Sequence, residues 1–174
     1  MTEEEPAGGD FPASGGGAPP DSADLDQAAE RPVSRLVFPV AGHGLLLDST
    51  SPMEFLEGQW PYYVPNNHPL FQGLINRRGT LVPVYEVRGL LDPDLAGQRE
   101  SNILVLGSGD DAVGIFLDGT PYRIAVIGER PGSPPVKLAQ VFGEHLGDSL
   151  EHEGQCYARV DLEDFLLGLV RDSH

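Results

Sequence analysis

Two stretches of the chain end an apolar run with an aspartate: "LLLDST" around Asp48 and "IFLDGT" around Asp118. Two carboxylates held against each other can share a proton and work as an acid–base dyad. That chemistry needs both aspartates in Asp-Ser/Thr-Gly turns, whereas the order here is Asp-Ser-Thr and Asp-Gly-Thr. Aspartates that end strands and enter turns are common. An acidic catalytic centre at Asp48 and Asp118 therefore stays an alternative, and strand ends are the favoured interpretation.

A second cluster, "EHLGDSLEHEGQC", brings His145 and His152 close in sequence to Cys156. None of the histidines forms a pair at helical or hairpin zinc spacing, so we interpret the cluster as solvated loop residues. Cys156 is the only cysteine, which excludes an intrachain disulfide and fits a reducing cytosol. We expect it in a strand, buried and inert. The sequence thus predicts no catalytic residue, no cofactor and no metal.

Three arginines, Arg77, Arg78 and Arg88, lie in "GLINRRGTLVPVYEVRGLL" (73–91), in a chain with only 11 basic against 27 acidic residues. This stretch predicts two strands joined by a turn at Gly79, with Arg77 and Arg78 in or beside the turn. Pro83 cannot donate to a ladder, so the second strand is an edge or its pairing is interrupted there. Exposed arginines beside such a strand either solvate the turn or mark a docking surface, since arginine is enriched at interfaces.

The net charge of −16 argues against binding to nucleic acid or to anionic membranes, both of which need a basic surface. The chain begins without the basic and apolar segments of a secretory signal, and no apolar run approaches the ~18–20 residues that span a bilayer. We therefore expect a cytoplasmic protein without direct membrane insertion. Residues 1–32 are rich in Gly, Pro, Ala and acids and predict a disordered acidic tail.

From residue 33 onward, short β-type runs follow one another at about ten-residue spacing, which is typical of a barrel or sandwich. The expected strands are 35–40, 44–48, 54–57, 73–77, 80–86, 102–107, 112–118, 122–128 and 156–161, with a hairpin turn at "GSGDDA". Two helices are expected. One is a short helix near "NHPLFQG" (67–73), and the other begins after an N-cap at Asp161 and carries a Leu/Phe stripe.

Several of these stretches resemble, in order and spacing, the CheW-like adaptor family of bacterial chemosensory systems. "VPNNHPLFQGLINRRGTLVPVYEVRGLL" is similar to the family's Gly-x-x-Asn-x-Arg-Gly turn and following Pro-Val strand. "LLLDSTSPMEFLEG", "ILVLGSGDDAVGIFLDGTPYRI" and "CYARVDLEDFL" resemble the segments on either side, so that the resemblance covers about residues 34–170. No kinase catalytic segment accompanies the domain, which suggests a stand-alone adaptor.

The resemblance implies an all-β fold of two small five-stranded β-barrels with a C-terminal helix. The domain would span 33–172, with a first barrel at about 33–90 completed by the C-terminus, a second barrel at 101–160 and the helix at 161–171. It implies a non-enzymatic adaptor that couples a chemoreceptor's cytoplasmic tip to the regulatory domain of a sensor histidine kinase, in chemotaxis or type IV pilus twitching motility. A β-barrel hydrolase and a ligand-binding β-barrel module stay open as alternatives.

The resemblance also assigns the partner-binding residues. A groove flanked by Asn76, Arg78 and Gly79 would face the receptor helices, with Arg78 as the first direct contact. The secondary candidates are Glu54, Phe55 and Val84, and an internal ion pair is the alternative role for Glu54. An exposed edge of the first barrel would meet the kinase.

Overall fold

The computed structural model describes residues 30–47, 50–65 and 67–171. The chain divides into two units between Arg31 and Pro32, and the fold described below is that of the second unit. Apart from residues 30–32, which are exposed and irregular, the predicted tail lies outside the described residues, as does Asp48.

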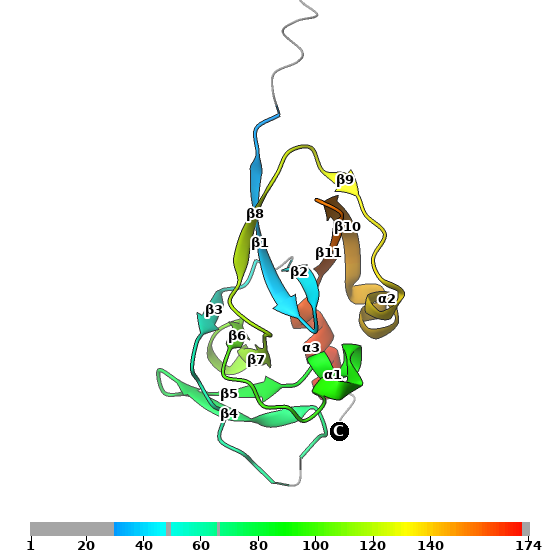
Figure 1. Ribbon diagram of the computed structural model, residues 1–174. Coiled ribbons are helices and arrows are strands. Elements are labelled where there is room, and N and C mark those ends of the chain that lie inside the picture. The colour runs from blue at the N-terminus through cyan, green and yellow to red at the C-terminus, as the bar shows by residue number, and fades with distance from the viewer. Residues whose placement is uncertain (1–29, 48–49, 66, 172–174) are drawn as a thin grey trace, which may run out of the picture. The chain divides into compact units, whose positions relative to one another are not determined.

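Six strands form the first sheet, in the spatial order β8-β1-β2-β11-β10-β9. Their bounds are Tyr122–Val126 for β8, Val33–Val40 for β1, His43–Leu47 for β2, Gln155–Val160 for β11, Leu146–His152 for β10 and Arg130–Pro131 for β9. All pairs are antiparallel except β2 with β11, which run parallel. The strands lie in the upper half of Figure 1.

The second sheet has five strands in the order β3-β6-β7-β5-β4, found in the lower half of Figure 1. They are Met53–Leu56 for β3, Ile103–Leu106 for β6, Val113–Phe116 for β7, Thr80–Tyr85 for β5 and Phe71–Arg77 for β4. The expected hairpin turn lies between β6 and β7, where it contains the 3₁₀ turn Gly109–Asp111.

The division of strands between the sheets differs from the expected one. All strands between residues 53 and 116 belong to one sheet, and the strands before and after them form the other, so no boundary falls near 90–101. The first sheet also has six strands rather than five, because β9 and β10 were not expected. Pro83 does not lie in an edge strand, since β5 is flanked by β7 and β4. The alternative of interrupted pairing holds: β5 pairs with β7 only at Val84 and Tyr85, just after the proline.

Three apolar cores hold the unit together. The largest lies between the sheets and draws side chains from β1, β2, β6, β7, β11 and the helices. A second core lies inside the five-stranded sheet and a third inside the six-stranded sheet. Strands β6 and β7 are buried at every residue because alternate side chains enter two different cores: Leu104 and Ile115 face the first, whereas Val105 and Phe116 face the second.

Of the two expected helices, the C-terminal one is confirmed as α3, Leu162–Arg171. The Asp161 side chain accepts a hydrogen bond from Asp164 N–H at 3.0 Å, as an N-cap should. Phe165 of α3 stacks edge-on against Phe142 at 5.0 Å and so joins the largest core.

The prediction of a short helix near 67–73 is wrong, because this segment forms a turn and then enters β4 at Phe71. The sequence analysis missed α1 (Arg88–Leu91), α2 (Val136–Phe142) and the 3₁₀ turns Pro93–Leu95 and Gly143–His145.

Candidate functional site

The β4–β5 hairpin closes through a two-residue turn at Arg78 and Gly79, because Arg77 and Thr80 pair across the strands. The backbone φ is +52° at Arg78 and +89° at Gly79, the left-handed conformation that such turns need. The side-chain oxygen of Asn76 accepts a hydrogen bond from Gly79 N–H at 3.0 Å. The predicted turn is thus present, and it places the exposed Arg78 at the end of the hairpin.

The left-handed arginine is not by itself a sign of function. Two other hairpins of this fold close in the same way, through Ala41–Gly42 between β1 and β2 and through Glu153–Gly154 between β10 and β11. Three hairpins of this fold therefore have a non-glycine residue followed by glycine in their two-residue turn. A role for Arg78 has to rest on its side chain. Within the described part of the chain, no hydrogen bond or ion pair engages that guanidinium.

A groove of about 460 Å³ opens beside this turn, between the two edge strands of the five-stranded sheet. Val82, Val105 and Ala112 give it an apolar floor continuous with the core inside that sheet. Its polar walls come from Glu54, Arg77, Arg78 and Thr80, and its rim from Pro52, Met53, Gly107, Ser108 and Gly109. The groove is therefore apolar at its floor and charged at one side.

Glu54 on β3 and Arg77 on β4 form an ion pair across this groove. Arg77 Nη2 contacts Glu54 Oε1, and its Nε donates to Glu54 Oε2 at 3.3 Å, so the contact is bidentate. The pair connects the first and last strands of the sheet, which no described backbone ladder joins. The expected alternative role of Glu54 as an internal ion-pair partner is therefore present, and Arg77 is its partner.

Phe55 and Val84 lie away from the groove's exposed surface. Phe55 points to the opposite side of β3 from Glu54 and packs against the core between the sheets. Val84 is fully buried in the core inside the five-stranded sheet. Its expected role as a direct partner contact is wrong, because its side chain has no accessible surface. The structure therefore brings Glu54, Asn76, Arg78 and Gly79 together around the hairpin end and leaves Phe55 and Val84 as supporting core residues.

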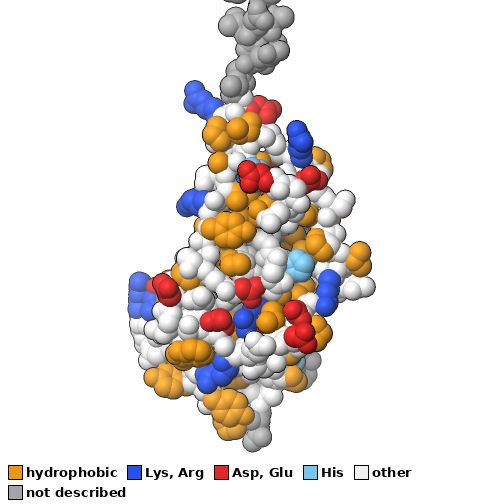
Figure 2. Space-filling view, viewed as in Figure 1, with side chains coloured by type: hydrophobic (Ala, Val, Ile, Leu, Met, Phe, Trp, Pro, Cys, Tyr) orange, Lys and Arg blue, Asp and Glu red, His pale blue; other side chains and the backbone are white. Residues whose placement is uncertain are grey.

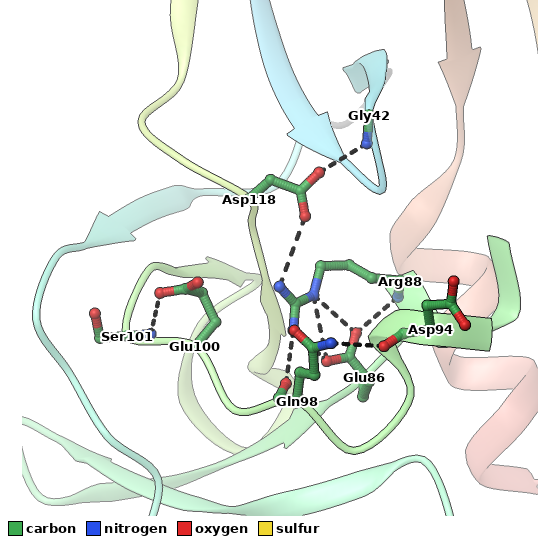
Figure 3. Close-up of polar contacts among 8 residues, drawn as sticks. All are labelled: Gly42, Glu86, Arg88, Asp94, Gln98, Glu100, Ser101 and Asp118. Carbon is green, nitrogen blue, oxygen red and sulfur yellow. Dashed lines mark hydrogen bonds and ion pairs between the residues drawn. The ribbon is translucent and has the colours of Figure 1, made fainter. Parts of the chain in front are cut away.

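Arg88, the third arginine of the cluster, is buried rather than exposed. Figure 3 shows its guanidinium enclosed by oxygen atoms. Arg88 Nε donates to the two carboxylate oxygens of Glu86 at 3.0 and 3.2 Å, and Nη2 donates to Glu86 Oε2 at 2.5 Å and to the Gln98 carbonyl at 2.7 Å. The Arg88 backbone N–H also donates to Glu86 Oε1 at 2.8 Å.

The same guanidinium reaches across to the other sheet. Arg88 Nη1 lies 3.6 Å from Asp118 Oδ1, while Asp118 Oδ2 accepts a hydrogen bond from Gly42 N–H at 2.8 Å. Gly42 lies in the β1–β2 turn of the six-stranded sheet, whereas Glu86 follows β5 of the five-stranded sheet. The Arg88 carbon Cζ also lies 5.4 Å from the centre of the Phe116 ring. The network thus ties the two sheets together at one buried cation (Figure 3).

The pKa of Arg88 shows how well this cation is compensated. Burial alone would lower the pKa of the guanidinium, because it disfavours the charged form. The hydrogen bonds and charge of Glu86, with the charges of Asp118 and Glu100, outweigh this effect and raise the pKa above its ordinary value. Arg88 therefore stays charged, and removing its partner carboxylate or the arginine itself leaves a buried ion unpaired.

The first alternative, an acidic catalytic centre at Asp48 and Asp118, gains no support. Both oxygens of Asp118 are engaged, one by the Gly42 N–H and one by Arg88, as expected of a carboxylate that serves to hold structure. Asp48 lies outside the described residues.

The two histidines expected in solvated loops lie in regular structure: His145 ends the 3₁₀ turn Gly143–His145, and His152 ends β10. Cys156 lies in a strand, β11, as predicted, but it is only partly buried. His145 Nδ1 contacts Asp164 Oδ2 of α3 at 3.2 Å. Burial raises the pKa of the Cys156 thiol, which lowers its thiolate fraction. Within residues 30–47, 50–65 and 67–171, no three His, Cys, Asp or Glu side chains are grouped as metal ligands would be. None of the helices described in this range is long and apolar enough to cross a membrane.

The described fold thus has two β-sheets, with an exposed arginine at the end of the β4–β5 hairpin beside an open groove. The model of the CheW-like domain family matches residues 35–166, so this chain belongs to the CheW-like domain family. The crystal structure of the scaffolding protein TtCheW from Thermoanaerobacter tengcongensis has the same fold, with a TM-score of 0.58 and 17% sequence identity. The match covers 80% of this chain and 90% of that one. No curated protein sequence matches.

Proposed function

We propose that this chain is a non-enzymatic adaptor that acts in the cytoplasm of a bacterial chemosensory pathway. It binds the cytoplasmic tip of a chemoreceptor through one surface and the regulatory domain of a sensor histidine kinase through another. Membership of the CheW-like domain family supports this proposal, and so does the fold it shares with a protein described as a scaffold. The pathway served is chemotaxis or type IV pilus twitching motility.

The observation that carries the proposal is the exposed Arg78 beside a groove with an apolar floor. Because Asn76 fixes Gly79 by a hydrogen bond, the hairpin end is rigid and the Arg78 side chain starts from a fixed position. Arginine in such a setting can make several hydrogen bonds at once to a partner's carboxylates or carbonyls. We assign the groove with Asn76, Arg78 and Gly79 to the receptor. Glu54 contributes through its ion pair with Arg77, which shapes the groove wall.

For the kinase, we propose the free edge of the six-stranded sheet at β8. The strand has β1 on one side only, and its residues Tyr122, Arg123 and Ala125 are exposed. A sheet edge offers unpaired backbone groups to a partner domain. Receptor and kinase would thus meet different sheets of one rigid body.

The two alternatives from other classes have less support. A hydrolase would need Asp118 free to exchange a proton, whereas Arg88 and Gly42 hold its carboxylate. A ligand-binding barrel would need an enclosed pocket. The groove beside Arg78 is bordered by the exposed residues Pro52, Met53 and Gly109 and is open to solvent.

Arg78→Ala tests the receptor assignment. We expect the dissociation constant for a receptor-tip fragment to rise about tenfold, because an arginine at a binding hot spot is worth more than about 1 kcal/mol. The free energy of unfolding should change by less than about 0.5 kcal/mol, since an exposed arginine contributes little. Alanine also suits this turn, as Ala41 occupies the equivalent position between β1 and β2.

Titration calorimetry with the receptor-tip fragment, together with urea unfolding, measures both quantities. Lys137→Ala, which removes an exposed cation from α2, is the matched control and should leave binding unchanged. Equal affinity of wild type and Arg78→Ala would remove Arg78 from the site.

A further inference from the structure

Three aromatic side chains in the segment between β3 and β4 are exposed to solvent. Trp60, Tyr62 and Tyr63 are 57%, 75% and 74% exposed. Figure 2 shows hydrophobic side chains gathered at the lower end of the molecule, where Figure 1 places β4 and the segment that precedes it. Buried aromatic rings are the rule in a small domain, so a group of three exposed rings calls for a reason.

The segment that carries these rings is held firmly to the sheet. Tyr62 N–H donates to the Leu74 carbonyl at 2.8 Å, and Leu74 N–H donates to the Tyr62 carbonyl at 3.0 Å. Arg99 Nη2 donates to the Pro61 carbonyl, and its Cζ lies 5.9 Å from the Trp60 ring centre. Exposed rings on a rigid segment lose little conformational entropy on binding, and tryptophan, tyrosine and arginine are the residues most often found at binding hot spots.

The apolar surface continues from Tyr62 over the outer face of the β4–β5 hairpin. Leu74 is paired with Tyr62 on one side and with Pro83 of β5 on the other. Leu81, two residues before Pro83 and so on the same face, is 62% exposed. We call this surface, made of Trp60, Tyr62, Leu74, Leu81 and Pro83, the aromatic face. It lies on the opposite side of β5 from Val82 and Val84, which point into the core.

The partner cannot bind here by adding a strand. β4 is an edge strand, but Tyr62 already forms both hydrogen bonds of a bridge at Leu74, in the middle of the free edge. A peptide strand would have to displace this segment. A partner must therefore contact this face through side chains, and the element that commonly covers an apolar sheet face is a helix.

The charges around the aromatic face indicate an acidic partner. Arg99 lies at its Trp60 end, and Arg78 lies at the hairpin end beyond Leu81 and Asn76. Among the residues that the structure describes, no carboxylate is paired with either guanidinium. Acidic side chains of a partner could therefore pair with both without displacing an existing ion pair.

A second copy of this chain fits poorly. Each aromatic ring offers about 150–250 Å² at full exposure, so the face presents on the order of 500 Å². A stable dimer needs about 800 Å² from each partner.

We propose that the aromatic face docks an amphipathic helix whose apolar stripe is bordered by acidic side chains. This inference rests on the proposed function in one respect: the helix is assigned to the receptor tip rather than to the kinase. The face extends the receptor surface from the hairpin end at Arg78 along the outside of β4 and β5.

The double variant Tyr62→Ala/Leu81→Ala tests the aromatic face, with a helical-hairpin fragment of the receptor tip as the probe. We expect its dissociation constant to rise at least tenfold, while the melting temperature stays within about 3 °C because both side chains are exposed. The matched control is Ile127→Ala/Val136→Ala, whose side chains are 65% and 72% exposed in other parts of the fold. It should bind as wild type does.

The outcomes separate this inference from the proposed function. If wild type does not bind the receptor fragment, the proposed function fails. If wild type binds and the Tyr62/Leu81 variant binds equally well, the aromatic face is not a receptor contact. Weakened binding to the kinase regulatory domain alone, or a loss of self-association in sedimentation alone, would likewise overturn the assignment.

Introducing a positive or a negative charge at residue 81 tests whether the partner helix is bordered by acidic side chains. Leu81→Lys and Leu81→Glu remove the same apolar contact but add opposite charges. If the partner helix is bordered by acids, Leu81→Lys binds the receptor fragment at least threefold more tightly than Leu81→Glu. Equal affinities, or the reverse order, would contradict an acidic partner.

Discussion

Replacing Arg88 with alanine is expected to lower the free energy of unfolding by about 3–5 kcal/mol, the cost of breaking a buried ion pair from one side. Arg88→Ala leaves the Glu86 carboxylate buried without its cation and removes donors from the Gln98 carbonyl and from Asp118. The loss should lower the urea concentration at the midpoint of unfolding relative to the wild type. Because the network joins the two sheets, we expect both to unfold in one transition.

Two comparisons isolate the effect of burial. Arg78→Ala removes an arginine ten residues earlier that is exposed, and it should change the free energy of unfolding by less than about 0.5 kcal/mol. The double variant Glu86→Leu/Arg88→Met replaces both ions by apolar groups and should be more stable than Arg88→Ala alone. A loss of under 1 kcal/mol in Arg88→Ala would mean that the network contributes little to the fold.

Gly73→Ala has the second large expected effect. A Cβ at residue 73 would lie 2.2 Å from the Tyr62 carbonyl oxygen. The backbone φ there is +136°, a conformation that residues other than glycine rarely adopt. Strain of this kind costs about 1–3 kcal/mol before the clash is added. We therefore expect a loss of roughly 3 kcal/mol or more in the free energy of unfolding, with release of the Tyr62 segment from β4.

Gly58→Ala is the matched control for Gly73→Ala. Gly58 also has a positive φ, +70°, but no atom lies within 4 Å of a Cβ built on it. Its loss should be limited to the left-handed strain, about 1–2 kcal/mol. Thermal melting of the two variants separates the effect of the steric clash from that of the backbone strain. Equal losses of stability in the two variants would show that the close approach of Tyr62 does not contribute.

The elements of the fold could be largely predicted from the sequence, whereas their grouping could not. Alternating apolar residues indicated β1 to β8 and β11, and the Asp161 cap with its Leu/Phe stripe indicated α3. Sheet membership depends on pairings of distant strands, which local patterns do not encode: the parallel pairs β2–β11 and β5–β7 and the antiparallel pairs β1–β8 and β3–β6. α2 was not predicted, although Leu138 and Phe142 have helical spacing and Pro135 lies directly before its first residue.

The candidate site was predicted in part. The Asn-x-Arg-Gly pattern led to the hairpin end, because a tight turn with glycine has a strong local signal. Period-two alternation along residues 82–88 puts Glu86 and Arg88 on the same side as Val82 and Val84, but only the structure shows that this side is buried. The aromatic face had no sequence signal, since Trp60 and Tyr62 have the composition of a core strand and their exposure depends on the bridge to Leu74.

The central claim is that this chain joins a receptor to a kinase. Its most direct test is the autophosphorylation rate of the sensor kinase in a mixture of purified receptor, kinase and this protein. We expect the rate to depend on the receptor only when the wild-type protein is present, and expect Arg78→Ala to remove most of that dependence. The same rate with and without the protein, at concentrations where receptor and kinase are both active, would contradict the account.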